Sequence, residues 1–600
     1  MDDARGASAA ASGSVTFAPL KVPEFRRIWS AAMVSHVGTF LQLTAGPWLM
    51  NEMTGSPLLV SLVTTALLLP RLLLTLPAGA LADVLDRRTL LLTGQTISAT
   101  AVTAMAVLAA TGLLEPVSLL ALTFVLGVGS VLALPAFQTL VPDLVDAPLR
   151  AQAITLNSAA FNVARAFGPA LGGALVAAGM ASAAFGANAV SYLAVIGVLL
   201  TFPRAAVTGE PRPGVWRSAA AGVRYARFTR SIRVLLAVAA VFALTSASLQ
   251  ALLPSVTSDD LGLGGLGFGV LYGCFGAGAL AGAFTRERVR TPAGKLMLPG
   301  SILLSGLGAA GFGLAPTPWL AGVAITIAGL AWVWTLTTMN ASVQILAPRW
   351  VRGRVVSLYV LAVGLQPVGA FLSGFIAEAS GAGNAVAIFG ASTVVLGAVT
   401  LRLGLPVLGR LEEPTPPEDW VVPQHARHVS GSPVLVLTTW EIDPDEVEEF
   451  FAAMRELRRH RYRSGAHRWS LFRDADRPHR VTEIFAVHDW EEHLAQHRRL
   501  DAEMVAVLTR ARSFDRAGGP VTRHLAGLDV VDPTAPPFEE QMLTVHEELH
   551  RRDGSVPLQR QEPPTSKGSS APGESPAPES PDHSGQTRSA RGPRPSLPDS

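Results

Sequence analysis

The sequence predicts an all-α polytopic membrane protein of twelve transmembrane helices in two six-helix halves, followed by a small α+β domain. Three observations lead to this prediction: the composition, the lengths of the apolar runs and the charges of the loops. The 600 residues are 49% hydrophobic and 16% charged, whereas soluble proteins carry about 25% charged residues. Apolar runs dominate up to about residue 408, and the rest of the chain is charge-rich and mostly polar. We therefore expect the first part to lie in a lipid bilayer and the second part in water.

A helix needs roughly 20 apolar residues to cross a bilayer. Such runs are centred near residues 39, 70, 100, 125, 164, 192, 243, 275, 306, 330, 366 and 394. The predicted organisation is an N-terminal segment (1–24), helices 1–6 (25–203), a basic linker (204–231) and helices 7–12 (232–408).

The charges of the loops predict the orientation. Lys and Arg precede helix 1 and follow helices 2, 4, 6, 8 and 10, whereas the intervening loops, such as NEMTGSP from Asn51 and SVTSDDLGLG from Ser255, contain neither. Because cytoplasmic loops retain basic residues, we expect a multi-pass protein of the plasma (inner) membrane with both termini, the N-terminal segment and the linker in the cytoplasm.

The two halves show a weak internal repeat. RAQAITL at Arg150 and RGRVVSL at Arg352 each open the fifth helix of a half, and the same offset of 202 residues places Gly172 over Gly374. Corresponding helices share an orientation, so a parallel repeat is predicted. Chance similarity between apolar helices is the alternative.

Two motifs lie in the first half. The turn after helix 2 reads GALADVLDRR, in which Gly79 allows close helix approach, Asp83 can meet a helix N-terminus or an arginine, and Arg87 and Arg88 anchor the basic side. Helix 5 carries GPALGG from Gly168 to Gly173. Here Pro169 removes a backbone donor and bends the helix, while Gly172 and Gly173 let a neighbouring helix approach.

These motifs resemble those of the major facilitator superfamily. The turn resembles its signature loop G-x-x-x-D-R-x-G-R-R, with Val84 and Asp86 as departures, and GPALGG resembles the G-P-x-x-G-G motif of its antiporters. With LPAFQTLVPDLV from Leu134 and the flanks of both fifth helices, residues 18–410 are similar to the branch that includes the enterobactin exporter, the transmembrane secretion effector type.

That resemblance implies a secondary transporter, with no catalytic residues and no cofactor. It implies export of a siderophore, drug or secondary metabolite by proton antiport through alternating access. An importer or permease on the same fold and a membrane scaffold without transport are the alternatives, and for GPALGG the alternative is helix packing unrelated to direction. No GxxxxGK[ST] loop occurs in the sequence, which argues against an ATP-driven pump.

Ionisable residues inside membrane helices are costly and point to function. They are His36 in helix 1, Arg71 in helix 2 and Arg165 in helix 5, and no carboxylate lies mid-helix. Two cations without an acidic partner predict an anionic substrate. The alternative is that each arginine satisfies helix carbonyls at a bend or extends to the membrane surface. For proton coupling His36 or Asp83 is the candidate, against a packing role for the histidine.

Polar residues on the same helices complete the candidate cavity. Asn162 shares a helix face with Arg165, and Gln42, Asn340 and Gln366 mark helices 1, 10 and 11. Hydrogen bonding between helices is the alternative role for each of them.

The segment 432–530 alternates as βαββαβ, which predicts a cytoplasmic ferredoxin-like domain. Its pattern, R-x-R-x-G-A-x-x-W from Arg461 to Trp469 and W-x-x-H-x-x-Q-H from Trp490 to His497, is similar to that of small antibiotic-biosynthesis monooxygenase domains. A monooxygenase-like activity is therefore the alternative to a role in dimerisation or regulation. His493 and His497 lie four residues apart, but no HExxH motif or third ligand is apparent. A solvated helix face and no metal are therefore predicted.

Two further predictions concern the tail and the partners. Residues 531–600 are rich in Pro, Ser and Gly, and we expect them to be disordered. The net charge of +2 argues against a nucleic-acid partner. The expected partners are lipid, protons, a small molecule and a second copy of the chain.

Overall fold

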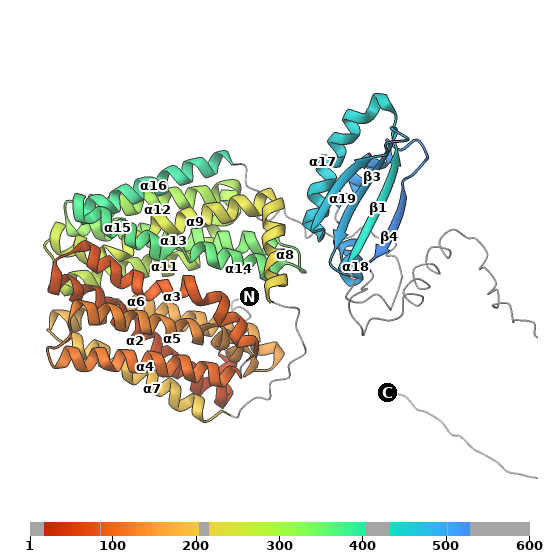
Figure 1. The fold of residues 1–600 in the computed structure, drawn as a ribbon. Helices are drawn as coiled ribbons and strands as arrows, with labels where there is room; N and C mark the ends of the chain where they lie inside the picture. The colour runs from red at the N-terminus through yellow and green to blue at the C-terminus, as the bar shows by residue number, and fades with distance from the viewer. Residues whose placement is uncertain (1–16, 85, 203–214, 404–432, 501, 528–600) are drawn as a thin grey trace, which may run out of the picture. The chain divides into compact units, whose positions relative to one another are not determined.

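The computed structural model describes residues 17–84, 86–202, 215–403, 433–500 and 502–527. The first three ranges form a helical region, and the last two form an α+β domain (Figure 1). The predicted disordered tail lies outside the described residues.

The first half of the helical region is built from long helices whose ends match local sequence signals. They are η1 (Ala18–Lys21), α2 (Pro23–Thr54), α3 (Pro57–Val84), α4 (Arg87–Ala110), α5 (Pro116–Asp143), η2 (Ala147–Leu149), α6 (Arg150–Ala177) and α7 (Ala181–Leu200). Pro23 and Pro116 lie in the first turns of α2 and α5, where a missing N–H costs nothing. Helix α2 ends at Gly55, whose φ of 59° favours glycine.

The second half repeats this pattern with more interruptions. Its elements are α9 (Arg230–Ala251), α10 (Leu253–Ser255), the π-helical turn η3 (Val256–Asp260), α11 (Gly265–Ala293), η4 (Gly294–Leu296), α12 (Met297–Gly313), α13 (Pro318–Leu346), α14 (Arg352–Val363), α15 (Gln366–Ser380) and α16 (Ala382–Arg402). The predicted helix 11 is divided at Gly364 and Leu365, because Pro367 in the first turn of α15 cannot donate a hydrogen bond.

The region between the halves contains a helix. The sequence predicts only a basic linker over 204–231, but helix α8 (Val215–Phe228) occupies its second part. Tyr225 of α8 is buried against Trp350, with ring centroids 5.8 Å apart. A Cβ at Gly222 would lie 2.8 Å from the Cβ of Arg354, so α8 packs closely on α14.

The helices are long and apolar enough for a polytopic membrane protein. Each predicted helix centre falls inside a helix. Among the described residues, ten segments meet the length and apolarity required for a membrane span; Gly265–Gly313 is one of them and contains both α11 and α12, while α2 is not among them. The exact count of twelve crossings therefore stays a prediction.

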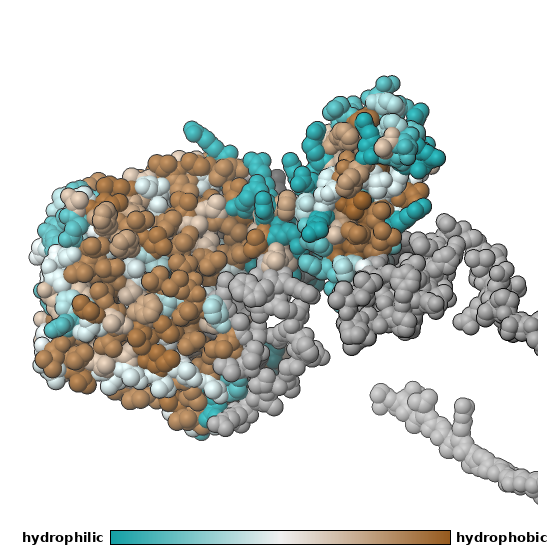
Figure 2. Space-filling view, viewed as in Figure 1, coloured by the Kyte–Doolittle hydropathy of each residue, from teal (hydrophilic) through white to brown (hydrophobic). Residues whose placement is uncertain are grey.

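The outer surface of the helical region is apolar, as contact with lipid requires. Figure 2 shows hydrophobic residues over most of its visible face. Val117, Phe284 and Trp319 are 75%, 73% and 67% exposed. Side chains of this kind are not left in water over so wide an area.

The contacts between the halves agree with the predicted parallel repeat. Helix α6, fifth in the first half, packs on α11, second in the second half. Helix α15, fifth in the second half, packs on α3, second in the first half. This exchange of partners is what two parallel repeats related by an axis along the membrane normal produce.

The C-terminal domain has its four strands in the predicted order, but two helices, α18 and α19, occupy the place of the one helix predicted between the last two strands. Its elements are β1 (Val434–Glu441), η5 (Pro444–Glu446), α17 (Val447–Ser464), β2 (Arg468–Arg473), β3 (Arg480–Val487), α18 (Trp490–Arg498), α19 (Ala502–Arg512) and β4 (Val521–Ala526). The strands form one sheet in the order β2-β3-β1-β4, and every neighbouring pair is antiparallel. Trp440, Phe450 and Phe485 are among its fully buried side chains. The ferredoxin-like identity of this sheet stays a prediction.

One prediction for this domain is wrong. His493 does not lie on a solvated helix face, because it is only 1% exposed. The helix face that carries it packs toward the sheet, and a third histidine, His524 of β4, lies beside it with ring centroids 4.7 Å apart. The spacing of residues within one helix could not show a contact with a strand that follows later in the chain.

Candidate functional site

The GPALGG motif places α6 between the two halves. A Cβ at Gly168 would lie 2.5 Å from the Cβ of Phe40 on α2, and a Cβ at Gly172 would lie 2.9 Å from that of Thr44. On the opposite side, a Cβ at Gly173 would lie 2.5 Å from the Cα of Gly269 on α11. Only glycine permits these approaches. The motif thus fixes α6 both to its own half and to the other half.

Pro169 lies inside this contact and is buried. Its carbonyl oxygen would be 2.8 Å from a Cβ placed on Gly269. Helix α6 is nevertheless continuous through Pro169 from Arg150 to Ala177. The proline therefore removes one hydrogen bond from α6 without ending it.

Arg165 lies just before the motif on α6, and its guanidinium group faces aromatic rings of the second half. Its Cζ is 4.7 Å from the ring centroid of Trp332 and 5.3 Å from that of Phe275. Aromatic faces attract a cation, by about 2 kcal/mol or more when water is excluded. Arg165 thus has a structural partner on α11 and α13 that the sequence did not reveal.

Arg71 on α3 has a different environment. Arg71 is exposed. Among the residues that the structure describes, no carboxylate forms an ion pair with its guanidinium group. Thr75 donates its hydroxyl to the Arg71 carbonyl, so this part of the backbone is satisfied without the guanidinium group. Of the two arginines, Arg71 is the one that keeps its charge available.

His36 on α2 packs against α6. Its ring meets Phe161 edge to face at 5.3 Å between centroids. Its Nε2 atom is buried and has no hydrogen-bond partner in the described part of the chain. The residue after Phe161 on α6, Asn162, donates to the Ser158 carbonyl at 2.9 Å, so its amide is partly satisfied within its own helix.

Gln42 is buried among the helices of the first half. It is 6% exposed, accepts a hydrogen bond from Asn188 of α7 and contacts the sulfur of Met105 on α4 at 3.4 Å. Asn188 also receives the hydroxyl of Ser191. The interhelical role that the sequence left open is therefore the one the structure shows.

The candidate residues of the second half lie apart from this network. Asn340 is exposed on α13 and accepts from Gln344 at 3.1 Å. Gln366 is half-buried and begins α15 at the break of the predicted helix 11. A break of this kind exposes backbone groups that can bind a substrate. No spacing in the sequence locates the break.

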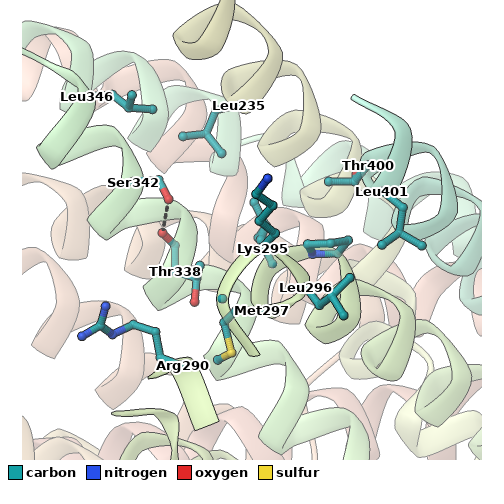
Figure 3. A pocket seen from close by; sticks show the side chains of 13 residues that line it. Leu235, Arg290, Lys295, Leu296, Met297, Thr338, Ser342, Leu346, Thr400 and Leu401 are labelled. Atoms are coloured by element: carbon teal, nitrogen blue, oxygen red, sulfur yellow. Dashed lines mark hydrogen bonds between the residues drawn. The ribbon is translucent and has the colours of Figure 1, made fainter. Parts of the chain in front are cut away.

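A pocket of about 220 Å³ lies within the second half, at the ends of α9, α11, α12, α13 and α16 (Figure 3). Arg290, Lys295, Thr338 and Ser342 line it together with apolar side chains. Ser342 donates to the Thr338 carbonyl at 2.8 Å. None of the predicted cavity residues His36, Gln42, Arg71, Asn162, Arg165, Asn340 and Gln366 lines this pocket.

The signature loop is partly described. Gly79 and Asp83 lie in the last turns of α3, and Arg87 begins α4, but their side chains lie outside the described residues. Arg88 donates to the carbonyls of Leu199 and Leu200 at 2.8 and 3.0 Å, which caps the end of α7. Asp86, a departure from the family motif, caps the start of α4 by accepting from the Thr89 N–H at 2.9 Å.

Hydrogen bonds join the two halves at the end of the helices that carries the loops without Lys or Arg. Asn51 of α2 donates to Ser258 at 2.8 Å and accepts from Ser255 at 3.2 Å. Sequence reasoning missed this contact. The sequence feature that could have indicated this contact is the pair of polar loops that begin near Asn51 and Ser255.

A second contact at the same end involves a carboxylate. Glu378 of α15 accepts from the Ser56 hydroxyl at 3.0 Å and from the Leu58 N–H at 3.3 Å. A negative charge at the start of α3 is favourable because it meets unsatisfied N–H groups and the positive end of the helix dipole. Nearby, Gly374 packs so closely on α3 that a Cβ would overlap Ser61.

Comparison with known proteins agrees with this architecture. The model of the family described as "transmembrane secretion effector" matches residues 14–528. The staphyloferrin A transporter of Staphylococcus aureus is 25% identical over 398 residues, which are 64% of this chain and 97% of that protein. The multidrug efflux pump Tap of Mycolicibacterium fortuitum is 28% identical, over 62% of this chain and 94% of the pump.

Solved structures show the same fold at lower identity. A bacterial homolog of the human lysosomal transporter Spinster, in an inward-facing unoccupied conformation, has a TM-score of 0.51 at 16% identity and covers 64% of this chain and 96% of its own. The nucleoside transporter NupG has a TM-score of 0.53 at 12% identity and covers 63% and 98%. With a family model that spans most of its length, this chain belongs to the transmembrane secretion effector family of major facilitator transporters, a family of transporters and not of enzymes.

Proposed function

We propose that this protein exports a small organic molecule across the plasma membrane. The observation that carries the proposal is the similarity to a multidrug efflux pump over 94% of that pump. The GPALGG motif supports it, because its glycines hold α6 between both halves as an antiporter motif requires. The siderophore transporter that the chain resembles makes siderophores one substrate class to test.

In alternating access, the contacts between the two halves at one end of the helices must form and break during transport. The hydrogen bonds of Asn51 and Glu378 hold the halves together at one end. We assign that end to the outside, because its loops contain no Lys or Arg. Opening toward the outside then requires these few exchangeable hydrogen bonds to break while the halves rock. Both termini lie in the cytoplasm in this arrangement.

Proton antiport is the proposed source of energy, with His36 as the group that binds the proton. It stands beside α6 in the first half, and its Nε2 is buried without a partner in the described residues. Histidine is the side chain whose ordinary pKa lies nearest to neutral pH. Asp83 in the signature loop is the other candidate group.

The preference for an anionic substrate now rests mainly on Arg71. Arg165 is stabilised by Trp332 and Phe275 and needs no anion. Arg71 has no carboxylate partner among the described residues, so an anionic ligand would stabilise its charge.

We also propose that the C-terminal domain forms a dimer through its sheet. Leu435, Phe472, Val521 and Leu525 expose 42%, 55%, 60% and 44% of their surface. Leu435 and Leu525 are directly paired across β1 and β4. An apolar sheet face of this extent is favourable when a second sheet covers it.

Retention of dyes in living cells tests the proposal. Cells that lack the gene should retain more of a transported dye than cells that carry it, with cationic ethidium and anionic fluorescein compared in parallel. The control is the deletion strain that carries an empty vector, with the total amount of membrane protein matched between the strains. Increased retention of fluorescein alone supports the anionic preference, and retention of ethidium alone contradicts that preference but not export. Lower dye content in the deletion cells would indicate import.

A further inference from the structure

Three histidines from two elements of the C-terminal domain converge on one point. His493 and His497 lie one turn apart on α18, and His524 lies on the edge strand β4. One ring nitrogen from each can be chosen so that all three lie within 4.8 Å of one another. His493 is buried, and the other two are half-buried.

The distances within this cluster match metal coordination. The Nε2 atoms of His493 and His497 are 3.2 Å apart. Two nitrogens that bind one tetrahedral zinc ion at 2.0–2.1 Å lie about 3.3 Å from each other. The His524 ring stands 4.7 Å from that of His493, between centroids, at an angle of 57°. Rotation of this half-buried side chain can bring its nitrogen to the same ion.

A charged side chain near His493, that of Arg461, is itself paired with a carboxylate. Burial, and to a smaller extent the neighbouring His497, His524 and Arg461, lower the pKa of His493 to about 2. The partner of Arg461 is the buried carboxylate of Glu483 at 3.0 Å. Arg461 therefore adds no unbalanced positive charge beside the cluster.

His493 is also incompletely satisfied in the protein alone. Its Nδ1 is buried without a hydrogen bond of good geometry, although Gln496 lies near enough to influence its charge. The Trp490 ring packs 5.3 Å from His493 and 5.6 Å from His524, between centroids, and so restricts both rings. A buried ring with an unpaired nitrogen and fixed neighbours is costly unless the cluster binds something.

We propose that His493, His497 and His524 bind one divalent transition-metal ion of the zinc type. Three imidazoles suit zinc, copper, nickel or cobalt, whereas magnesium and calcium prefer oxygen ligands. Three protein ligands leave a fourth position for water or another ligand. The ion would join α18 to β4, which pairs with the sheet only through β1. Metal binding would thus stabilise the edge of this domain.

Zinc binding by the full-length protein tests this site. The protein is purified in detergent with an affinity tag that contains no histidine, stripped with a chelator, incubated with zinc sulfate and desalted. Mass spectrometry of the metal should give about one zinc per chain. Cobalt(II) in place of zinc should give the visible absorption of a tetrahedral nitrogen site.

Two variants distinguish this site from other histidines. The double variant His497→Gln/His524→Gln, which changes the half-buried ligands, should bind zinc at least about tenfold more weakly. His479→Gln, at an exposed histidine of the same domain, should bind like the wild type. Circular dichroism and gel filtration check that both variants are folded.

The measurements on the wild type test the proposed metal site even if the double variant fails to fold. Less than about one zinc in ten chains of wild type overturns it, and so does equal affinity of a folded double variant. The cobalt spectrum of the wild type gives an independent result: absence of tetrahedral bands at saturating cobalt also overturns it. Hydrogen bonding between His493 and His497 alone would then account for their 3.2 Å separation.

Discussion

Arg71 and Arg165 show two ways in which a charged side chain is accommodated in an apolar helix. Arg165 extends from α6 over the faces of Trp332 and Phe275, so it connects the two halves without any acid. Arg71 is exposed on α3, and the structure describes no carboxylate paired with it. From the sequence both arginines are predicted to be cations without a partner. The aromatic partners of Arg165 lie more than 100 residues away in the chain, so no local pattern indicates them.

His36 is the residue at which proton coupling is most directly tested. Replacing it with Gln keeps a polar side chain but removes the titrating group, so we expect transport driven by a pH gradient to fall at least about tenfold. Exchange of labelled for unlabelled substrate without a gradient should persist. The matched control is Ser35→Ala on the same helix, whose side chain cannot titrate. If His36→Gln retains gradient-driven transport, the proton binds elsewhere, with Asp83 the next candidate.

At the scale of elements, α6 is the helix that the two halves share. Gly173→Ala should force α6 and α11 apart, because the added Cβ would lie 2.5 Å from the Cα of Gly269. We expect a loss of about 1–3 kcal/mol of stability and a strong reduction of transport, measured by thermal unfolding in detergent and by dye efflux. Gly186→Ala on α7 is the matched control, since a Cβ there meets nothing within 4 Å. Equal behaviour of the two variants would contradict the role given to the motif.

The sheet of the C-terminal domain gives a second prediction at this scale. Leu435→Asp places a charge in the centre of the exposed apolar face and should weaken a dimer at least about tenfold. Sedimentation of the full-length protein in detergent measures the change. Thr509→Asp on α19 controls for charge alone, because it is an exposed polar position outside the sheet. A wild type that sediments as a monomer at all concentrations would contradict the dimer.

Local sequence signals accounted for the elements better than for their contacts. Apolar runs located each helix because a span must be long and apolar, and the alternation in 432–530 located each strand. They did not predict helix α8, whose basic residues resemble those of a linker, or the break before Gln366. The hydrogen bond of Gln42 to Asn188 could not be located from the sequence, because its partner lies on another helix. His524 was missed because its partners lie on another element.

For the whole molecule, the contacts at one end of the halves should control access. Asn51 and Ser258 touch through a hydrogen bond of 2.8 Å, so a short bifunctional reagent that forms a disulfide with each thiol should link cysteines at these positions. In a Cys274→Ala background, linking Asn51→Cys to Ser258→Cys should abolish transport, and reduction should restore it. Each single cysteine variant is the control. Full transport by the linked protein would show that the halves need not separate there.

Direction is the central claim, and transport by everted membrane vesicles tests it most directly. In these vesicles the cytoplasmic side of the protein faces outward. The interior is made acidic, and the probe is the dye that the deletion cells retain. An exporter driven by protons should accumulate that dye inside these vesicles and lose it when the gradient is collapsed. Accumulation only in right-side-out vesicles, with none in everted ones, would contradict export and identify the protein as an importer.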